Sequence, residues 1–216
     1  MFRIFRGLKA MPRYTGQAVL ALLALFVALL PSGLQASAQI TLDATSQQTG
    51  AAGIISLSWS HVLGSGGSRM IVCGVTLAYN DTAVAAPLAV TPSMTFGGLA
   101  MTASVQAPTH AESSTAKIFS QIFYIDEAGL GSVGAGTYNV VLTIPTAVTG
   151  GASGGCTSLF GVNQAAPEAT ATGYSGSSTA VTDALTTITA GDWVIDAFAG
   201  GYGSNGSATP TELIWT

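Results

Sequence analysis

Apolar side chains alternate with small polar ones along much of this chain. In residues 55–62 (ISLSWSHV), Ile55, Leu57 and Trp59 alternate with serines. A period of two places the large side chains on one face of a β-strand and the serines on the other. The run 69–79 (RMIVCGVTLAY) is apolar almost throughout, which is typical of a central strand that is buried on both faces.

The same reasoning predicts about eight to nine strands in all, separated by glycine, proline and serine. Gly97 and Gly98 supply a tight hairpin turn, and the glycine-rich residues 149–155 are predicted to be a loop. No segment shows a sustained helical period, so the pattern indicates an all-β fold, an antiparallel β-sandwich. The remaining predicted strands are 93–104 (the hairpin), 117–125, 137–144, 156–162, 184–189 and 192–199.

Two glycine motifs resemble catalytic or cofactor-binding turns. Residues 128–136 (AGLGSVGAG) contain the spacing G-x-G-x-x-G, and residues 151–155 (GASGG) contain G-x-S-x-G around Ser153. Both motifs require a helix directly after the glycines, whereas β-branched, strand-like sequence follows each of them here. We therefore predict an ordinary loop at 128–136 and no nucleophilic role for Ser153.

The first 38 residues have the pattern of a secretory signal peptide. Four basic residues precede the uninterrupted apolar run 18–30, and Ala36-Ser37-Ala38 offers a cleavage site. Thirteen apolar residues are fewer than the roughly 20 that a membrane-spanning helix needs. The sequence thus predicts a secreted or cell-surface protein with one domain at 39–216 and no membrane span in the mature chain.

Charge narrows the classes of partner. Only Arg69 and Lys117 are basic after residue 38, while all ten acidic residues lie there, so the mature chain has a net charge of 2 − 10 = −8. Two cations cannot form the basic surface that a nucleic-acid backbone requires. Nucleic-acid binding is therefore excluded, and so is adhesion to an anionic membrane.

Cys73 and Cys156 are the only cysteines. In an oxidising compartment they could form a disulfide that closes a span of 156 − 73 = 83 residues and contributes about 4 kcal/mol. Because each lies in an apolar, strand-like run, two buried thiols that act as small hydrophobic side chains are slightly favoured. Both alternatives remain open at this point.

Candidate binding residues lie in segments that look like loops. Tyr79, Tyr174 and Tyr202 could stack on the apolar face of a sugar ring, whereas Trp59 is assigned to the core. Loop carbonyls with a carboxylate such as Asp81 or Asp126 could bind Ca²⁺, which remains open as a cofactor.

No constellation of residues indicates an enzyme. His61 and His110 lack a neighbouring catalytic motif and are predicted to be structural or solvated. A glycan hydrolase or lyase would need two convergent carboxylates, and no pair stands out by its spacing. The acidic residues considered are Glu112, Asp126, Glu127 and Glu168.

Several segments together resemble a recurring bacterial module of secreted and surface proteins. They are SWSHVLGSGGSRMIVCGV, SMTFGGLAMT, QIFYIDEAGLGSVGAGTYNVVLTI, SLFGVNQAAP and DWVIDAFA. The resemblance implies a jelly-roll-like β-sandwich with an adhesive, carbohydrate-binding or scaffolding role, and it supplies no catalytic residues. It also implies a further closing strand after residue 216, so the chain could be truncated, with an open sheet edge for strand addition.

From the sequence we therefore expect a secreted, non-enzymatic module for surface adhesion or structure. A carbohydrate-binding module and a glycan-active hydrolase or lyase are the alternatives. The expected partners are an extracellular glycan, a surface protein, or a second copy bound through an edge strand.

Overall fold

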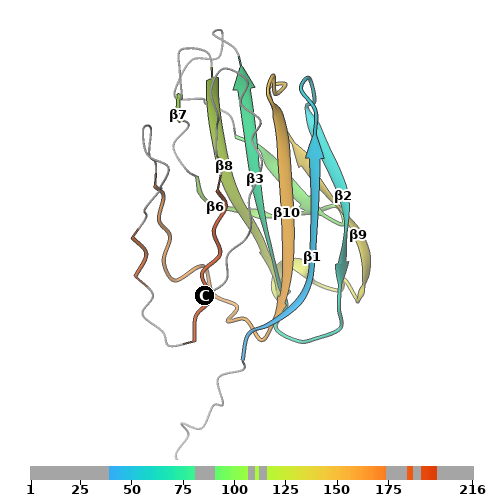
Figure 1. The fold of residues 1–216 in the computed structure, drawn as a ribbon. Helices are drawn as coiled ribbons and strands as arrows, with labels where there is room; N and C mark the ends of the chain where they lie inside the picture. Colours follow the sequence, from blue (N-terminus) through green and yellow to red (C-terminus); the bar gives the residue numbers. More distant parts are fainter. Residues whose placement is uncertain are drawn as a thin grey trace, which may run out of the picture. The chain divides into compact units, whose positions relative to one another are not determined.

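A computed structural model describes residues 39–80, 91–106, 110–111, 116–173, 184–186 and 191–198. In these residues, β-strands form two antiparallel sheets that pack against each other (Figure 1). The only helix in this part of the chain is the single turn α2 (Glu127–Leu130). The predicted all-β, sandwich-like architecture is thus confirmed.

The six-stranded sheet has the order β1-β10-β3-β8-β6, and the short β7 also pairs with β8. The four-stranded sheet has the order β2-β9-β4-β5. The strands of the first sheet are β1 (Thr41–Gly50), β3 (Met70–Asn80), β6 (Thr102–Gln106), β7 (His110–Ala111), β8 (Ala116–Asp126) and β10 (Gly151–Phe160). Those of the second are β2 (Ser56–Leu63), β4 (Ser93–Phe96), β5 (Leu99–Ala100) and β9 (Gly136–Thr143).

The core lies between the two sheets and follows from the alternation of the strands. In β2 the even-numbered positions are exposed and the odd-numbered ones are buried, so the serines face solvent as predicted. Ile55 is an exception, because it precedes the strand and is 61% exposed. The largest fully buried side chains are Tyr79, Phe96, Phe119, Phe123, Leu63, Ile71, Leu77, Met94, Leu130, Leu142, Ile144 and Leu159.

The central strands and the hairpin agree with the sequence pattern. Gly97 and Gly98 have φ angles of 56° and 85°, which glycine adopts without the steric cost that other residues meet. They join β4 to β5, as the turn signal predicted. The segment 128–136 connects β8 to β9, so it is a connection between strands, with α2 as its first turn.

Three predictions of strand position were wrong. The glycine-rich residues 151–155 form the first half of β10 and not a loop. Gly154 lies beneath the Trp59 indole, and a Cβ atom there would come within 2.7 Å of the ring. Conversely, alternation predicted strands at 184–189 and 192–199, but residues 184–186 and 192–198 are not in a strand. The remaining residues of these two ranges lie outside the described part of the chain.

The outer face of the six-stranded sheet is covered, which confirms that β3 is buried on both faces. On that face Val72, Thr76 and Thr157 are each at most 5% exposed. Ala197 lies over Gly74, where a Cβ atom would meet it at 2.9 Å. Of the described C-terminal residues, Ala197 therefore lies over this face, and residues 191–198 are not part of the sheet.

The N-terminal residues 1–38 lie outside the described part of the chain, and the compact unit described here belongs to Gln39–Thr216. Within the described residues there is no helix of the length and apolarity that crossing a membrane requires.

Candidate functional site

Cys73 and Cys156 form a disulfide between neighbouring strands of the six-stranded sheet. They are directly opposite in the β3–β10 register, and their Cα atoms are 4.0 Å apart. The slight preference for two free thiols was therefore wrong, and the disulfide alternative is the one observed. Two residues 83 positions apart meet because β3 and β10 pair in this register, which cysteine spacing alone does not reveal.

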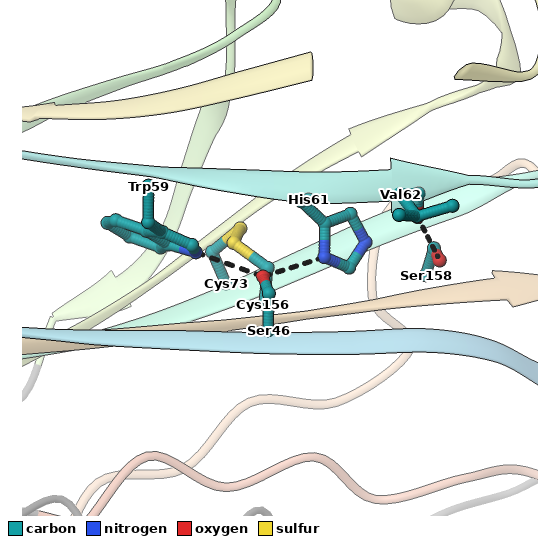
Figure 2. Close-up of a disulfide and its surroundings, with 7 residues drawn as sticks. All are labelled: Ser46, Trp59, His61, Val62, Cys73, Cys156 and Ser158. Carbon is teal, nitrogen blue, oxygen red and sulfur yellow. Dashed lines mark hydrogen bonds between the residues drawn. A yellow bond between two sulfur atoms is a disulfide. The ribbon is translucent and has the colours of Figure 1, made fainter. Parts of the chain in front are cut away.

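A buried polar cluster joins the two sheets beside this disulfide (Figure 2). Ser46 on β1 accepts a hydrogen bond from Trp59 Nε1 at 3.0 Å. Its Oγ atom lies 2.8 Å from Nδ1 of His61. Trp59 and His61 are two residues apart on β2 and point to the same face, so a single serine on the opposite sheet connects to both.

His61 is 1% exposed and has a structural position. Burial lowers the pKa of His61, and the negative charge of Asp43 opposes that shift only in part. Its Nε2 atom has no hydrogen-bond partner among the described residues, and the ring packs edge-on against Phe96 at 6.1 Å. A neutral, enclosed imidazole connects the sheets and is not placed to act as a general base on a substrate.

Asp43 fixes the end of the same cluster. Its Oδ2 atom accepts hydrogen bonds from the backbone N–H of Gly64 at 2.8 Å and from the Ser158 hydroxyl at 2.7 Å. The β1–β10 register shifts at this residue, between Leu42 and Ala44. The irregularity lets the Asp43 carboxylate reach the N–H group that follows β2.

At one end of the sandwich, an ion pair holds three loops together. The Arg69 side chain donates to both carboxylate oxygens of Glu127 and to the carbonyl of Val133. The Glu127 carboxylate also accepts from the Arg69 backbone N–H at 2.7 Å, and Gln164 Oε1 accepts from the Glu127 backbone N–H. These residues come from the segments that carry the resemblance noted above, and the contacts give them a structural role.

β2 forms an edge of the four-stranded sheet, and half of its backbone groups point away from that sheet. Ile144 N–H donates to Ile55 C=O, and the strands then pair in the register Ser56 with Thr143 through Leu63 with Gly136. In an antiparallel ladder, alternate residues face the partner strand. The odd-numbered residues of β2 therefore bond to β9, and the N–H and C=O groups of Ser56, Ser58, Ser60 and Val62 face outward.

The outward edge of β2 faces β1 of the same chain, which runs alongside it without forming a β-ladder. At Val62 the backbone carbonyl lies 3.4 Å from the Ser158 hydroxyl of β10. The next outward N–H group, that of Gly64, is capped by Asp43. This end of β2 is therefore held to β1 and β10 of the same chain.

The other sheet edges in the described residues are protected against further pairing. β1 has a register shift and an inward acid at Asp43, and β6 has a register shift between Ala103 and Gln106. β5 contains only two residues. Bulges, charges and shortness are the usual devices that prevent edge pairing. β2 is regular, uncharged and free of proline, and β1 of the same chain lies along its edge instead.

The outer face of the four-stranded sheet is uncharged as well. Cross-strand rows run from β2 across β9, and to β4 at one end. Their outward residues are Ser56, Ser58, Ser60, Val62, Thr137, Asn139, Val141, Thr143, Ser93 and Thr95. Surfaces of soluble domains normally contain about 25–35% charged residues, so this face together with the β2 edge is an unusual surface.

The structure corrects one of the three tyrosines proposed for sugar binding. Tyr79 is in β3 and fully buried, where its hydroxyl donates to the Thr146 carbonyl at 3.3 Å and burial raises its pKa to about 12. It cannot stack on a ligand. Tyr174 and Tyr202 lie outside the described residues, so the carbohydrate hypothesis now depends on these two.

The proposed metal and acid residues have local structural contacts where they are described. The Asp126 side chain accepts from Gly129 N–H at 2.8 Å and caps α2, while Asp81 lies outside the described part. Glu127 forms an ion pair with Arg69, and Glu112 lies outside the described residues. No group of three or more metal-ligating side chains occurs in the described residues, and calcium stays an untested prediction.

The residues that sequence reasoning missed are those of β1. Ser46 and Asp43 hold β1 to β2 and β10, but TLDATSQQTG has little apolar alternation. The isolated serine and aspartate had no motif that could single them out. Comparison with protein-family models, with curated proteins and with solved structures finds no match for this chain.

Proposed function

We propose that this chain is a secreted, non-enzymatic module for surface adhesion or extracellular assembly, with the jelly-roll-like connectivity that its sequence resemblance implies. The observation that carries the proposal is the buried disulfide between Cys73 and Cys156 inside an all-β sandwich, because such bridges are typical of exported domains. The uncharged outer face of the four-stranded sheet supports a role in surface contacts.

The disulfide supports the proposed export of the protein to an oxidising, extracytoplasmic compartment. A bridge between Cys73 and Cys156 persists in oxidising surroundings and is rare in the cytosol. It agrees with a cleavable N-terminal signal ending at Ala38. The described polar side chains support a non-enzymatic role, because His61, Asp126 and Glu127 are each used to connect strands or loops.

The proposal is tested by expressing the full chain with a C-terminal tag in a bacterial host and fractionating the culture. We expect tagged protein outside the cytoplasm, an N-terminus at Gln39 by mass spectrometry, and no reactive thiol after denaturation. The variant Leu25→Arg, which puts a charge inside the apolar run, should retain the protein in the cytoplasm; Gln35→Arg is the matched control outside the run.

Uncleaved wild-type protein in the cytoplasm with two reactive thiols would overturn the proposed function. The exported protein should also be incubated with insoluble polysaccharides, with and without Ca²⁺. Saturable binding that is lost in Tyr174→Ala or Tyr202→Ala would instead establish the carbohydrate-binding alternative.

A further inference from the structure

We propose that Gln39 is a modification site: after the signal segment is removed, its side chain closes onto its own α-amine and forms an N-terminal pyroglutamate. The proposal deepens the export function above and rests on it, because Gln39 becomes the amino end only when cleavage follows Ala38. The ring caps the chain two residues before β1 begins at Thr41.

The reaction needs only groups that the mature amino end itself supplies. The α-amino nitrogen attacks Cδ of the Gln39 side chain, so that an N–Cδ bond forms and the Cδ–Nε2 bond breaks. The side-chain nitrogen leaves as ammonia, the product is a five-membered lactam, and no oxidant or reductant takes part. An α-amine is a weak enough base that part of it is unprotonated, and therefore nucleophilic, near neutral pH.

The structure leaves the Gln39 side chain free to fold back onto the amine. Gln39 is exposed and is not in a strand. The β1–β10 ladder begins only at Thr41, which lies opposite Phe160. Cyclisation at Gln39 therefore breaks no backbone pairing of the sheet.

β1 is the strand for which a blocked amino end has the largest consequence. None of its ten residues is buried, so little apolar surface holds it in place. Asp43 and Ser46 hold it to its neighbours through hydrogen bonds. Only 43 − 39 = 4 residues precede Asp43 in the mature chain, so stepwise digestion from a free Gln39 would reach the first of these contacts quickly.

The lactam removes the group through which such digestion starts. Aminopeptidases recognise a free α-amine, whereas the nitrogen of the ring belongs to an amide and carries no charge. Cyclisation of Gln39 thus closes the chain to stepwise digestion from this end and keeps β1 whole outside the cell.

The test uses the full chain, exported as described above and purified from outside the cytoplasm. Its intact mass should be lower than that of the oxidised chain cleaved after Ala38 by the mass of one ammonia. An aminopeptidase should release nothing from the amino end of this protein. After treatment with a pyroglutamyl peptidase, which removes only the lactam residue, the aminopeptidase should release Ile40 next.

Gln39→Asn is the matched control, because its side chain is one methylene shorter and cannot close a five-membered ring. This variant should keep its full mass, and an aminopeptidase should remove the substituted residue and Ile40, which precede the ladder. Gln39→Glu keeps the side-chain length but replaces the amide with a carboxylate, a much poorer electrophile, and should also keep a free amine over the same time. This second variant keeps the test decisive if the first is cleaved poorly by the signal peptidase.

A wild-type chain that begins at Gln39 and still has a free, reactive α-amine after prolonged incubation at neutral pH would overturn the inference and leave the proposed export intact. Equal resistance of wild type and Gln39→Asn to the aminopeptidase would contradict the role of the ring as a cap. An uncleaved chain in the cytoplasm would overturn the proposed function, and the inference with it.

Discussion

Ser46 Oγ lies 2.8 Å from His61 Nδ1, and this contact joins the edge strand of one sheet to the edge strand of the other. Trp59 donates to the same oxygen, so one small side chain on β1 holds two large ones on β2. All three groups lie at the side of the sandwich where β1 runs alongside β2, so the cluster closes this side of the molecule.

Replacing Ser46 with alanine should destabilise the fold by about 1–3 kcal/mol, because a buried Trp59 N–H and the His61 Nδ1 would lose their partner. Chemical denaturation would measure the change. Thr45→Ala is the matched control on the exposed face of β1 and should cost little. Equal effects of the two substitutions would mean that the cluster contributes nothing specific.

Stability should decrease as the pH falls below the ordinary histidine pKa of 6.5. Burial lowers the pKa of His61 in the folded chain, so between the two values the unfolded chain binds a proton that the folded chain does not, which favours unfolding. Urea unfolding at pH 8, 7, 6 and 5.5 measures this slope. In His61→Gln the free energy of unfolding should depend less on pH. His110 is present in both proteins, so its contribution cancels in the comparison. Identical pH dependence in the two proteins would contradict the assignment of this effect to His61.

A second pH-dependent contribution belongs to Glu127. The hydrogen bonds from Arg69 lower the pKa of Glu127 below its ordinary value of 4.5, although partial burial opposes this. The stabilisation is therefore present above that value and is lost as the pH falls below it. Glu127→Gln should be less stable than wild type near pH 7 and should lose part of the acid-induced decrease, as acid titration followed by circular dichroism would show.

Arg69→Lys should cost on the order of 1–3 kcal/mol at neutral pH, since lysine cannot hold the Glu127 carboxylate with a two-pronged contact and also reach Val133. Lys117→Arg, which changes the chemistry in the opposite direction elsewhere in the chain, is a control. Thermal melts of both variants would decide this, and a loss no larger than that of the control would contradict a role for the guanidinium geometry.

Removing the disulfide with Cys73→Ala/Cys156→Ala should cost about 4 kcal/mol in the chain-entropy description of an 83-residue span. Guanidinium unfolding would measure the loss. Wild-type protein exposed to a reductant only while folded should keep its stability, because both cysteines are fully buried. Rapid reduction of the folded protein would show that this part of the core opens.

The sequence determined the fold class and most of the strands. Strict alternation in β2 and the long apolar run of β3 could be interpreted locally, because strand periodicity is a property of neighbouring residues. The Gly97-Gly98 turn was equally local. β1 and the first half of β10 were missed because small and polar residues form them, and their strand conformation depends on partners far away in the chain.

Only the tertiary structure decided what these elements do together. It paired Cys73 with Cys156, buried Tyr79, and placed Ser46 against Trp59 and His61. It also placed β1 alongside β2, which the composition of neither strand reveals. Sequence periodicity reports which face of a strand is buried, whereas register and strand order depend on contacts between residues tens of positions apart, and those contacts create the candidate site.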